Sequence, residues 1–195
     1  VNHLDLQIKQ GELYSLLGVN GAGKTTTIKM LSGLVMPTSG EAYLNGKSIV
    51  KETNEVKRII GVSPQETAVA PNLSVKENLE LMCGIHGFSK EKRTKKIAEL
   101  TEQFDLGSIS KKKAGKLSGG WQRRLSIAMA LISEPEILFL DEPTTGLDPA
   151  TRVDVWNTVK ALQQSEKMTV FLTTHYMEEA ASAENIIILD HGNII

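Results

Sequence analysis

The chain has 195 residues, of which 41% are hydrophobic and 23% are charged, and its formal net charge is −1. This length is enough to bury one hydrophobic core, and the near-neutral charge provides no basic field, so we expect no nucleic-acid partner. The sequence has no apolar run of the roughly 18 residues that a membrane-spanning helix needs, and no signal-peptide pattern, so we expect a soluble, cytosolic chain.

The first predicted strand, residues 13–17, is short and mostly apolar and leads directly into a glycine-rich loop. A helix is predicted over residues 26–31, with Gly33 as its stop. Residues 41–45 alternate between apolar and polar and are followed by an Asn-Gly turn, which predicts an antiparallel hairpin. The chain therefore begins as strand, loop and helix, with a small β layer beside them.

The middle of the chain has a different character. After a strand predicted over residues 59–63, residues 65–116 are charged and almost free of strand signals, and residues 75–85 and 90–104 have the apolar spacing of helices. The single cysteine, Cys83, has apolar neighbours, so we expect it to fill the core, and the lysines at 111–113 are expected in a solvated loop. We interpret residues 65–116 as an inserted helical lobe.

Helices and strands alternate again after Gly120. Helices are predicted over residues 121–132, 150–164 and 177–181, and strands over residues 137–140, 169–173 and 185–189. This pattern predicts an α/β fold with a mainly parallel sheet covered by helices on both faces, in one domain whose core lobe is residues 1–64 and 117–195. Ligands of such sheets bind beyond the carboxyl ends of the strands, which groups four residues along one crevice: Gly18, Gln65, Asp141 and His175.

Residues 18–25 read Gly-Val-Asn-Gly-Ala-Gly-Lys-Thr, which is the complete phosphate-binding loop (P-loop) pattern of nucleoside triphosphatases. The glycines allow successive backbone N–H groups to turn toward an anion, and the helix N-terminus adds partial positive charge. Lys24 should neutralise the β and γ phosphates, and Thr25 should offer its hydroxyl to Mg²⁺. The alternative is a glycine turn without a ligand. The predicted ATP-binding residues are Gly18, Asn20, Gly21, Ala22, Gly23, Lys24, Thr25 and Thr26.

Two adjacent carboxylates, Asp141 and Glu142, follow an apolar strand, where they would repel each other without a metal or a catalytic task. We expect Asp141 to hold Mg²⁺ and Glu142 to orient and deprotonate the attacking water. Gln65 could reach Mg²⁺ or water, and His175 the γ phosphate. The catalytic candidates are thus Glu142, His175 and Gln65, and the metal candidates are Thr25, Gln65 and Asp141. Helix capping by a carboxylate, a structural histidine and an ordinary loop glutamine are the alternatives.

A second helix start, Ser118-Gly119-Gly120, also suits an anion. Ser118 is expected at the N-cap, and the two glycines would let a phosphate approach the backbone. In isolation, an ordinary N-cap explains this pattern. Two such helix starts in one chain suggest that both hold the same nucleotide, one from each of two molecules.

In these motifs and their order, the chain resembles the nucleotide-binding domain of ATP-binding cassette (ABC) proteins over essentially all its length. Residues 18–25 resemble the Walker A loop, Gln65 the glutamine loop, residues 117–120 the signature, residues 137–142 Walker B and His175 the switch histidine. The resemblance implies ATP and Mg²⁺ as ligands. It also implies two domains arranged head to tail, in which one subunit completes the ATP site of the other through Ser118, Gly119, Gly120 and Asp148.

The resemblance further implies a transmembrane permease as partner, which would hold the chain at the cytoplasmic face of the cell membrane. Closure on ATP and opening after hydrolysis would drive the permease between inward- and outward-facing states. The second cassette is either another copy of this chain or a different one. Residues 39–41, the compact helical lobe and residues 173–179 look most similar to bacterial drug exporters, which implies export of drugs or other small molecules.

The chain departs from the family pattern at two points. Trp121 stands where the family usually has glutamine, so the signature helix begins with a bulky ring. The aromatic residue that stacks on adenine in the family has no counterpart, because Tyr14 lies on the strand that feeds the phosphate loop. The abrupt ends at Val1 and Ile195 lead us to expect a chain trimmed at both ends. Because no aromatic residue is available to stack on adenine, we expect weak ATP affinity. A submicromolar dissociation constant for Mg-ATP would contradict this expectation.

Three other readings remain open at this point. A soluble cassette of the translation-factor type would act on ribosomes rather than through a permease. A P-loop kinase or small GTPase would share residues 18–25 but would not need Glu142 or the Ser-Gly-Gly helix start. A regulatory cassette without hydrolysis would fit Trp121, and Glu142 and His175 argue against it.

Overall fold

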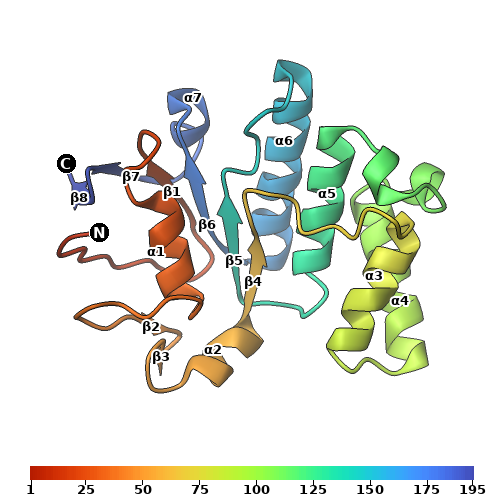
Figure 1. Ribbon diagram of the computed structural model, residues 1–195, viewed down its shortest axis with the longest axis horizontal. Coiled ribbons are helices and arrows are strands. Elements are labelled where there is room, and N and C mark those ends of the chain that lie inside the picture. The colour runs from red at the N-terminus through yellow and green to blue at the C-terminus, as the bar shows by residue number, and fades with distance from the viewer.

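A computed structural model describes residues 1–195, apart from the side chain of residue 166. A six-stranded sheet has the order β4-β5-β6-β1-β7-β8, and a second sheet pairs β2 with β3 (Figure 1). Neighbouring strands from β4 to β7 are parallel, whereas β8 is antiparallel to β7 and β2 is antiparallel to β3. The strands are β1 (Leu13–Leu17), β2 (Tyr43–Leu44), β3 (Lys47–Ser48), β4 (Ile60–Ser63), β5 (Ile137–Asp141), β6 (Thr169–Thr174), β7 (Asn185–Asp190) and β8 (Asn193–Ile194). The predicted α/β fold and antiparallel hairpin are confirmed.

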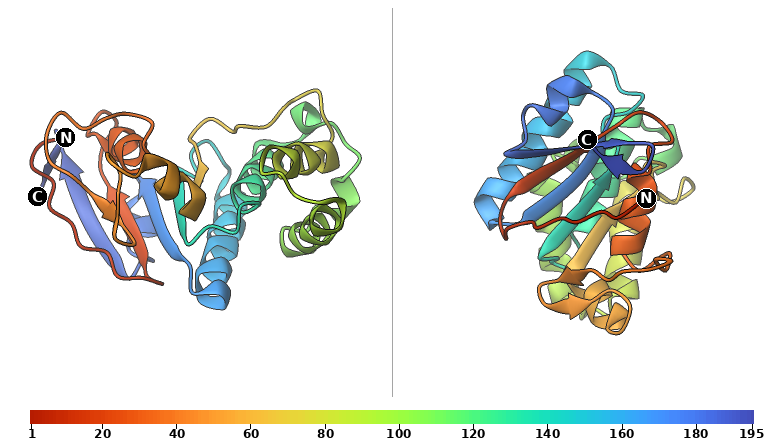
Figure 2. Two further views of the ribbon diagram at one scale, coloured as in Figure 1. Left: turned by 90° about the horizontal axis from the view of Figure 1, so that it is seen from below. Right: turned by 90° about the vertical axis from the view of Figure 1, so that its left-hand side faces the viewer.

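Helices cover both faces of the large sheet. Helices α1 and α2 pack with the side chains of one face in one hydrophobic cluster, and α5 and α6 pack with those of the other face in a second cluster. Figure 2 shows α1 and α6 on opposite sides of the sheet. Every residue of β1, β5 and β6 is buried, which explains their continuous apolar sequences. The helices are α1 (Lys24–Leu31), α2 (Thr53–Ile59), α3 (Val75–Ile85), α4 (Lys90–Gln103), α5 (Gly119–Ala130), α6 (Pro149–Glu166) and α7 (Met177–Ala180).

Helices α3 and α4 lie beyond α5, on the side away from the sheet (Figure 1). A capping box formed by Ser74 and Glu77 begins α3, and the hydroxyl of Ser89 accepts a hydrogen bond from the first turn of α4. Their buried residues share one core cluster with α5 and one face of the sheet. Cys83 belongs to this cluster and is fully buried, as expected, whereas the lysines at 111–113 are exposed.

Some elements differ from the sequence prediction. Helix α2 was not predicted, because it has only seven residues and its N-cap, Glu52, makes no side-chain capping bond. Helix α5 begins two residues earlier than predicted, since Gly119 and Gly120 form its first turn despite their low helix propensity. Among the described helices, none is both long and apolar enough to cross a membrane.

The parallel strands deliver four chain segments to one edge of the sheet. In the register of the sheet, Leu17 pairs with Thr174, and Asp141 pairs with Thr173. Strand β4 joins this arrangement through Ser63, which pairs with Leu140. The residues that follow these positions therefore converge at the carboxyl edge of the sheet.

Candidate functional site

The loop after β1 curves tightly over the start of α1. Gly18 passes so close to β7 that a Cβ atom on it would lie 2.4 Å from the carbonyl oxygen of Leu189. Gly23 occupies the N-cap of α1 with φ of 110°, a left-handed conformation that favours glycine. The sequence therefore needs glycine at both positions to bring the backbone N–H groups of the helix start to the edge of the sheet.

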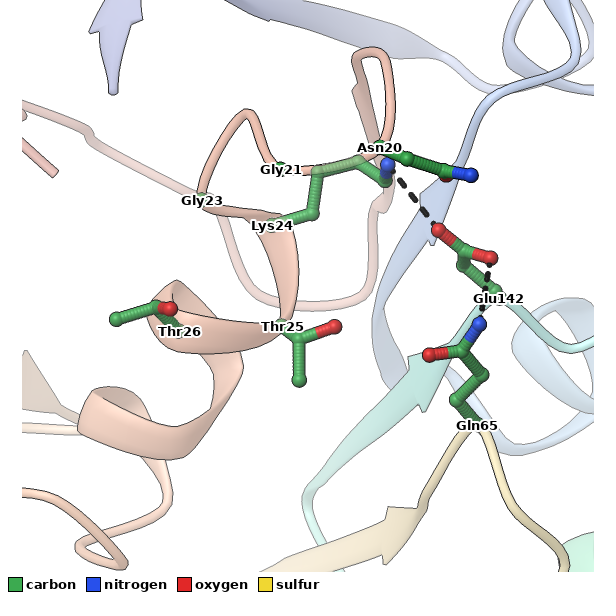
Figure 3. Close-up of a pocket in the computed structure, with 8 residues that line it drawn as sticks. All are labelled: Asn20, Gly21, Gly23, Lys24, Thr25, Thr26, Gln65 and Glu142. Carbon is green, nitrogen blue, oxygen red and sulfur yellow. Dashed lines mark hydrogen bonds and ion pairs between the residues drawn. The ribbon is translucent and has the colours of Figure 1, made fainter. Parts of the chain in front are cut away.

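One pocket of about 220 Å³ lies at this edge (Figure 3). Two residues from other strand ends, Gln65 and Glu142, close it opposite the glycine loop. Of the eight predicted ATP-binding residues, Gly18 and Ala22 are not among its lining residues. The side chain of Thr26 is directed away from Glu142 in the close-up. The residues lining the pocket are Asn20, Gly21, Gly23, Lys24, Thr25, Thr26, Gln65 and Glu142.

Lys24 is buried within its own loop. Its ammonium donates hydrogen bonds to the carbonyl oxygens of Gly18, at 2.8 Å, and Val19, at 3.1 Å. Its Nζ also lies 3.1 Å from Oε1 of Glu142, and both side chains of this ion pair are almost fully buried. An ammonium has three donors, and these three oxygens match them. The positive charge of the loop is thus held against the carboxylate that follows β5.

Glu142 brings the predicted catalytic residues together. Its Oε2 accepts hydrogen bonds from Nε2 of Gln65 and Oγ1 of Thr145, both at 3.0 Å. Nδ1 of His175 lies 3.5 Å from the same oxygen and, among the described residues, has no hydrogen-bond partner although it is buried. Gln65, Glu142 and His175 therefore meet at one carboxylate.

Asp141 lies beside this cluster and is itself buried. Its Oδ1 accepts hydrogen bonds from the hydroxyl of Thr25, at 3.2 Å, and from that of Thr173, at 2.7 Å. The structure thus joins two of the three predicted metal-binding residues directly, and Gln65 reaches them through the neighbouring Glu142. Hydroxyl, carboxylate and amide oxygens are the hard donors that Mg²⁺ prefers, so this set fits the ion.

The four residues predicted to act across subunits do not line the pocket. Ser118 is at the N-cap of α5, as expected, but its hydroxyl makes no capping hydrogen bond. Gly120 has a packing reason, because a Cβ on it would lie 2.3 Å from Cγ2 of Thr151 in α6. Asp148 caps α6: its carboxylate accepts hydrogen bonds from the hydroxyl and backbone N–H of Thr151, which lowers the pKa of Asp148.

Sequence reasoning missed three side chains that support the site. Arg123 of α5 donates hydrogen bonds to the carbonyl oxygens of Pro64 and Gln65, at 2.6 and 2.5 Å. The hydroxyl of Thr173 contacts both carboxylate residues, since it donates a hydrogen bond to Asp141 and accepts one from the backbone N–H of Glu142. Glu179 accepts hydrogen bonds from Thr144 and Thr174, at 2.5 and 2.7 Å, and so ties the loop after β5 to the end of β6. Apart from the contact between Thr174 and Glu179, these hydrogen bonds join residues more than 30 positions apart in sequence, so no local motif could have indicated them.

Aromatic residues are absent from the described lining of the pocket. Tyr14 is buried, and its hydroxyl donates a hydrogen bond to the carbonyl oxygen of Gln7 at 3.3 Å. It is therefore not positioned to stack on a base in the pocket. The expectation of weak ATP affinity stays a prediction.

Comparison with known proteins identifies the family. A model of the family described as "ABC transporter" matches residues 1–145. The chain belongs to this family. Its similarity to curated ABC proteins extends over the whole chain, because DrrA, the doxorubicin resistance ATP-binding protein of Mycobacterium tuberculosis, is 43% identical over all of it.

Other ABC relatives carry related descriptions. DrrA3 of Streptomyces coeruleorubidus, a daunorubicin resistance ATP-binding protein, is 42% identical over 98% of the chain. YbhF of Escherichia coli, described as a probable multidrug ABC transporter ATP-binding protein, is 38% identical over the whole chain, which matches 33% of YbhF. The chain spans 59% of DrrA and 61% of DrrA3.

Solved structures of ABC cassettes have the same fold. CbiO1 of Clostridium perfringens, part of the transporter complex CbiONQ, superposes with a TM-score of 0.90 at 26% identity over 98% of the chain and 78% of CbiO1. The cassette MJ0796 superposes with a TM-score of 0.85 at 33% identity over 97% of the chain and 85% of MJ0796. That MJ0796 structure is a dimer in a post-hydrolysis state with ADP and phosphate bound.

Proposed function

We propose that this ABC-family chain binds and hydrolyses ATP as the nucleotide-binding subunit of a transporter that exports drugs or other small molecules. The observation that carries the proposal is the cluster around the buried Glu142, which contacts Lys24 of the glycine loop and Gln65 and lies beside His175. Descriptions of the relatives as drug-resistance and multidrug proteins favour export over the ribosome-acting alternative.

Each residue of the cluster has a role in this proposal. The glycine-loop N–H groups and Lys24 would bind the phosphates of ATP, so that the ammonium exchanges its contacts with Glu142 for contacts with phosphate oxygens. Thr25, Asp141 and Gln65 would hold Mg²⁺, which neutralises charge on the phosphates when bound. Once released from Lys24, Glu142 would accept the proton of the attacking water, and His175 would contact the γ phosphate.

The proposal extends to a second subunit and a membrane partner. Ser118, Gly119, Gly120 and Asp148 would contact ATP held by the opposite cassette, which agrees with their position outside the pocket and with the dimer of the related MJ0796. Residues 65–116 would act as a helical lobe within a single domain and would face a transmembrane permease. The working location would be the cytoplasmic face of the membrane. Copurification of the tagged protein from detergent-solubilised cells tests this: a stoichiometric polytopic protein supports it, and ribosomes would contradict it.

Phosphate release by the 195-residue chain with Mg-ATP tests the catalytic part of the proposal. Replacement of Glu142 by glutamine removes the proton acceptor but keeps the size of the side chain, so we expect a loss of at least about 100-fold in kcat. The matched control is Glu134→Gln, which makes the same change at an exposed carboxylate paired with Lys92. Equal phosphate release by wild type and Glu142→Gln would rule out the catalytic role.

A further inference from the structure

The hydroxyl of Thr173 joins the two carboxylate residues of the site. Thr173 is fully buried on β6, directly opposite Asp141 in the register of the sheet. Its Oγ1 donates a hydrogen bond to Oδ1 of Asp141, at 2.7 Å, and accepts one from the backbone N–H of Glu142, at 2.9 Å. A hydroxyl has a single proton, so its donor is committed to Asp141.

Each of these two contacts restrains one residue of the carboxylate pair. The hydroxyl of Thr25, which also reaches Oδ1 of Asp141, is longer at 3.2 Å and belongs to the glycine loop. Glu142 has a left-handed backbone with φ of 45°, which a non-glycine residue adopts only where its surroundings hold it. The side chain of Thr173 contributes to that hold, since its Oγ1 accepts a hydrogen bond from the Glu142 N–H at the point where β5 ends.

We propose that Thr173 is a positioning residue for the carboxylate pair, an inference that rests on the proposed ATPase function. Its hydroxyl keeps the carboxylate of Asp141 oriented while Thr25 turns to a metal ion. Through the Glu142 N–H, it also fixes the backbone that directs the Glu142 side chain toward Lys24 and Gln65. Thr173 itself lines no part of the pocket, so it acts only through these two neighbours.

A purely structural role would have a different signature. A buried hydroxyl that only satisfies its neighbours would lower stability when removed but would leave the Mg²⁺ dependence of nucleotide binding unchanged. A positioning role affects kcat and Mg²⁺-dependent binding, because both depend on where the two carboxylates point. Thr173→Val removes the hydroxyl at nearly constant shape, and Thr173→Ser keeps it.

The first measurement is steady-state ATP hydrolysis by the whole chain. We expect kcat of Thr173→Val to fall by about 10- to 100-fold, as for losses of groups that orient metal ligands, and KM for Mg-ATP to rise because Mg²⁺-dependent binding is weakened. Thr173→Ser should stay within about 3-fold of wild type on both constants because it keeps the same donor and acceptor. The second measurement is calorimetric binding of a non-hydrolysable ATP analogue. Thr173→Val should lose most of the affinity gained from Mg²⁺ and should bind as wild type does in EDTA.

Thr169→Val is the matched control. Thr169 is a buried threonine at the other end of β6 whose hydroxyl accepts a hydrogen bond from the backbone N–H of Gly11 at 2.9 Å. It should lose stability without a change in kcat or Mg²⁺ dependence. Wild-type activity in Thr173→Val, or equal losses in both valine variants, would overturn the inference alone. Absence of hydrolysis in the wild-type chain would instead overturn the proposed function and the inference with it.

Discussion

At the scale of single residues, the site is organised by opposite charges held out of water. Lys24 and Glu142 are almost fully buried and lie 3.1 Å apart. Taking either charge out of water is costly, and this cost is met here by their mutual attraction and by hydrogen bonds to both groups. The pair therefore keeps both charges inside the protein, and under the proposed function a phosphate would replace the carboxylate as the partner of Lys24.

Removal of Lys24 alone should destabilise the protein. Lys24→Met leaves the Glu142 carboxylate buried without its counter-charge, so we expect a loss of about 3 kcal/mol in the free energy of unfolding. Adding Glu142→Gln should restore part of this loss, because the remaining side chain is then neutral. Urea unfolding of the two single variants and the double variant measures the cycle.

Lys92→Met is the control for this cycle, since Lys92 pairs with Glu134 at the surface and both side chains are half exposed. Its effect should stay below about 1 kcal/mol. If Lys24→Met unfolds at the same urea concentration as Lys92→Met, the buried pair does not contribute as argued.

The residue-scale site was predictable only in part. The sequence indicates three of the site residues because they belong to short local patterns that are rare without a functional reason. These residues are Lys24 in the glycine loop and the adjacent carboxylates Asp141 and Glu142 after an apolar strand. Thr173 has no such pattern, because its role comes from the register between β5 and β6. The sequence predicts a phosphate contact at Gly120, yet packing against Thr151 also requires a residue without a side chain there.

At the scale of elements, α5 connects the Ser-Gly-Gly segment with the loop after β4. Arg123 is buried in α5, and burial is the main cause that lowers its pKa. Its two hydrogen bonds go to backbone carbonyl oxygens at Pro64 and Gln65. Long helices such as α3 and α6 were predicted closely because apolar spacing and capping residues mark them, whereas a contact between a helix and a distant loop leaves no such mark.

Loss of the Arg123 side chain should therefore affect Gln65. In Arg123→Met, two backbone carbonyl groups lose their hydrogen-bond donors, and the Gln65 amide is no longer held 3.0 Å from Glu142. We expect kcat for ATP hydrolysis to fall about 10-fold, since small misplacements of catalytic groups have effects of this size or larger. A double variant with Gln65→Ala should lose little more than either single variant, because both changes remove the same contact.

Arg124→Met provides the control on the same helix. Arg124 pairs with Asp154 of α6 at 3.4 Å and lies over the ring of Trp121. The kcat of Arg124→Met should stay within about 2-fold of wild type, because surface ion pairs contribute little free energy. Additive losses for Arg123→Met and Gln65→Ala would contradict the coupling.

At the scale of the whole molecule, the pocket contains only part of the residues expected to contact ATP. The loop, Gln65 and Glu142 line it, whereas Ser118 and Asp148 lie elsewhere on the chain. Ser118 is exposed and its hydroxyl makes no capping hydrogen bond, so the stability of α5 does not depend on it. A substitution at Ser118 can therefore test a contact between two subunits without disturbing the fold of one subunit.

A dimer that forms only with ATP is the expected behaviour of the complete site. In the Glu142→Gln background, which should bind ATP without hydrolysing it, Mg-ATP should convert the monomer to a dimer in size-exclusion chromatography with light scattering. Ser118→Arg should abolish this dimer without changing the unfolding midpoint, because the larger side chain blocks only the contact between subunits. The control is Ser108→Arg, at another exposed serine, which should still form the dimer. Dimer formation by the Ser118→Arg variant would show that the Ser-Gly-Gly segment does not complete the site of a partner.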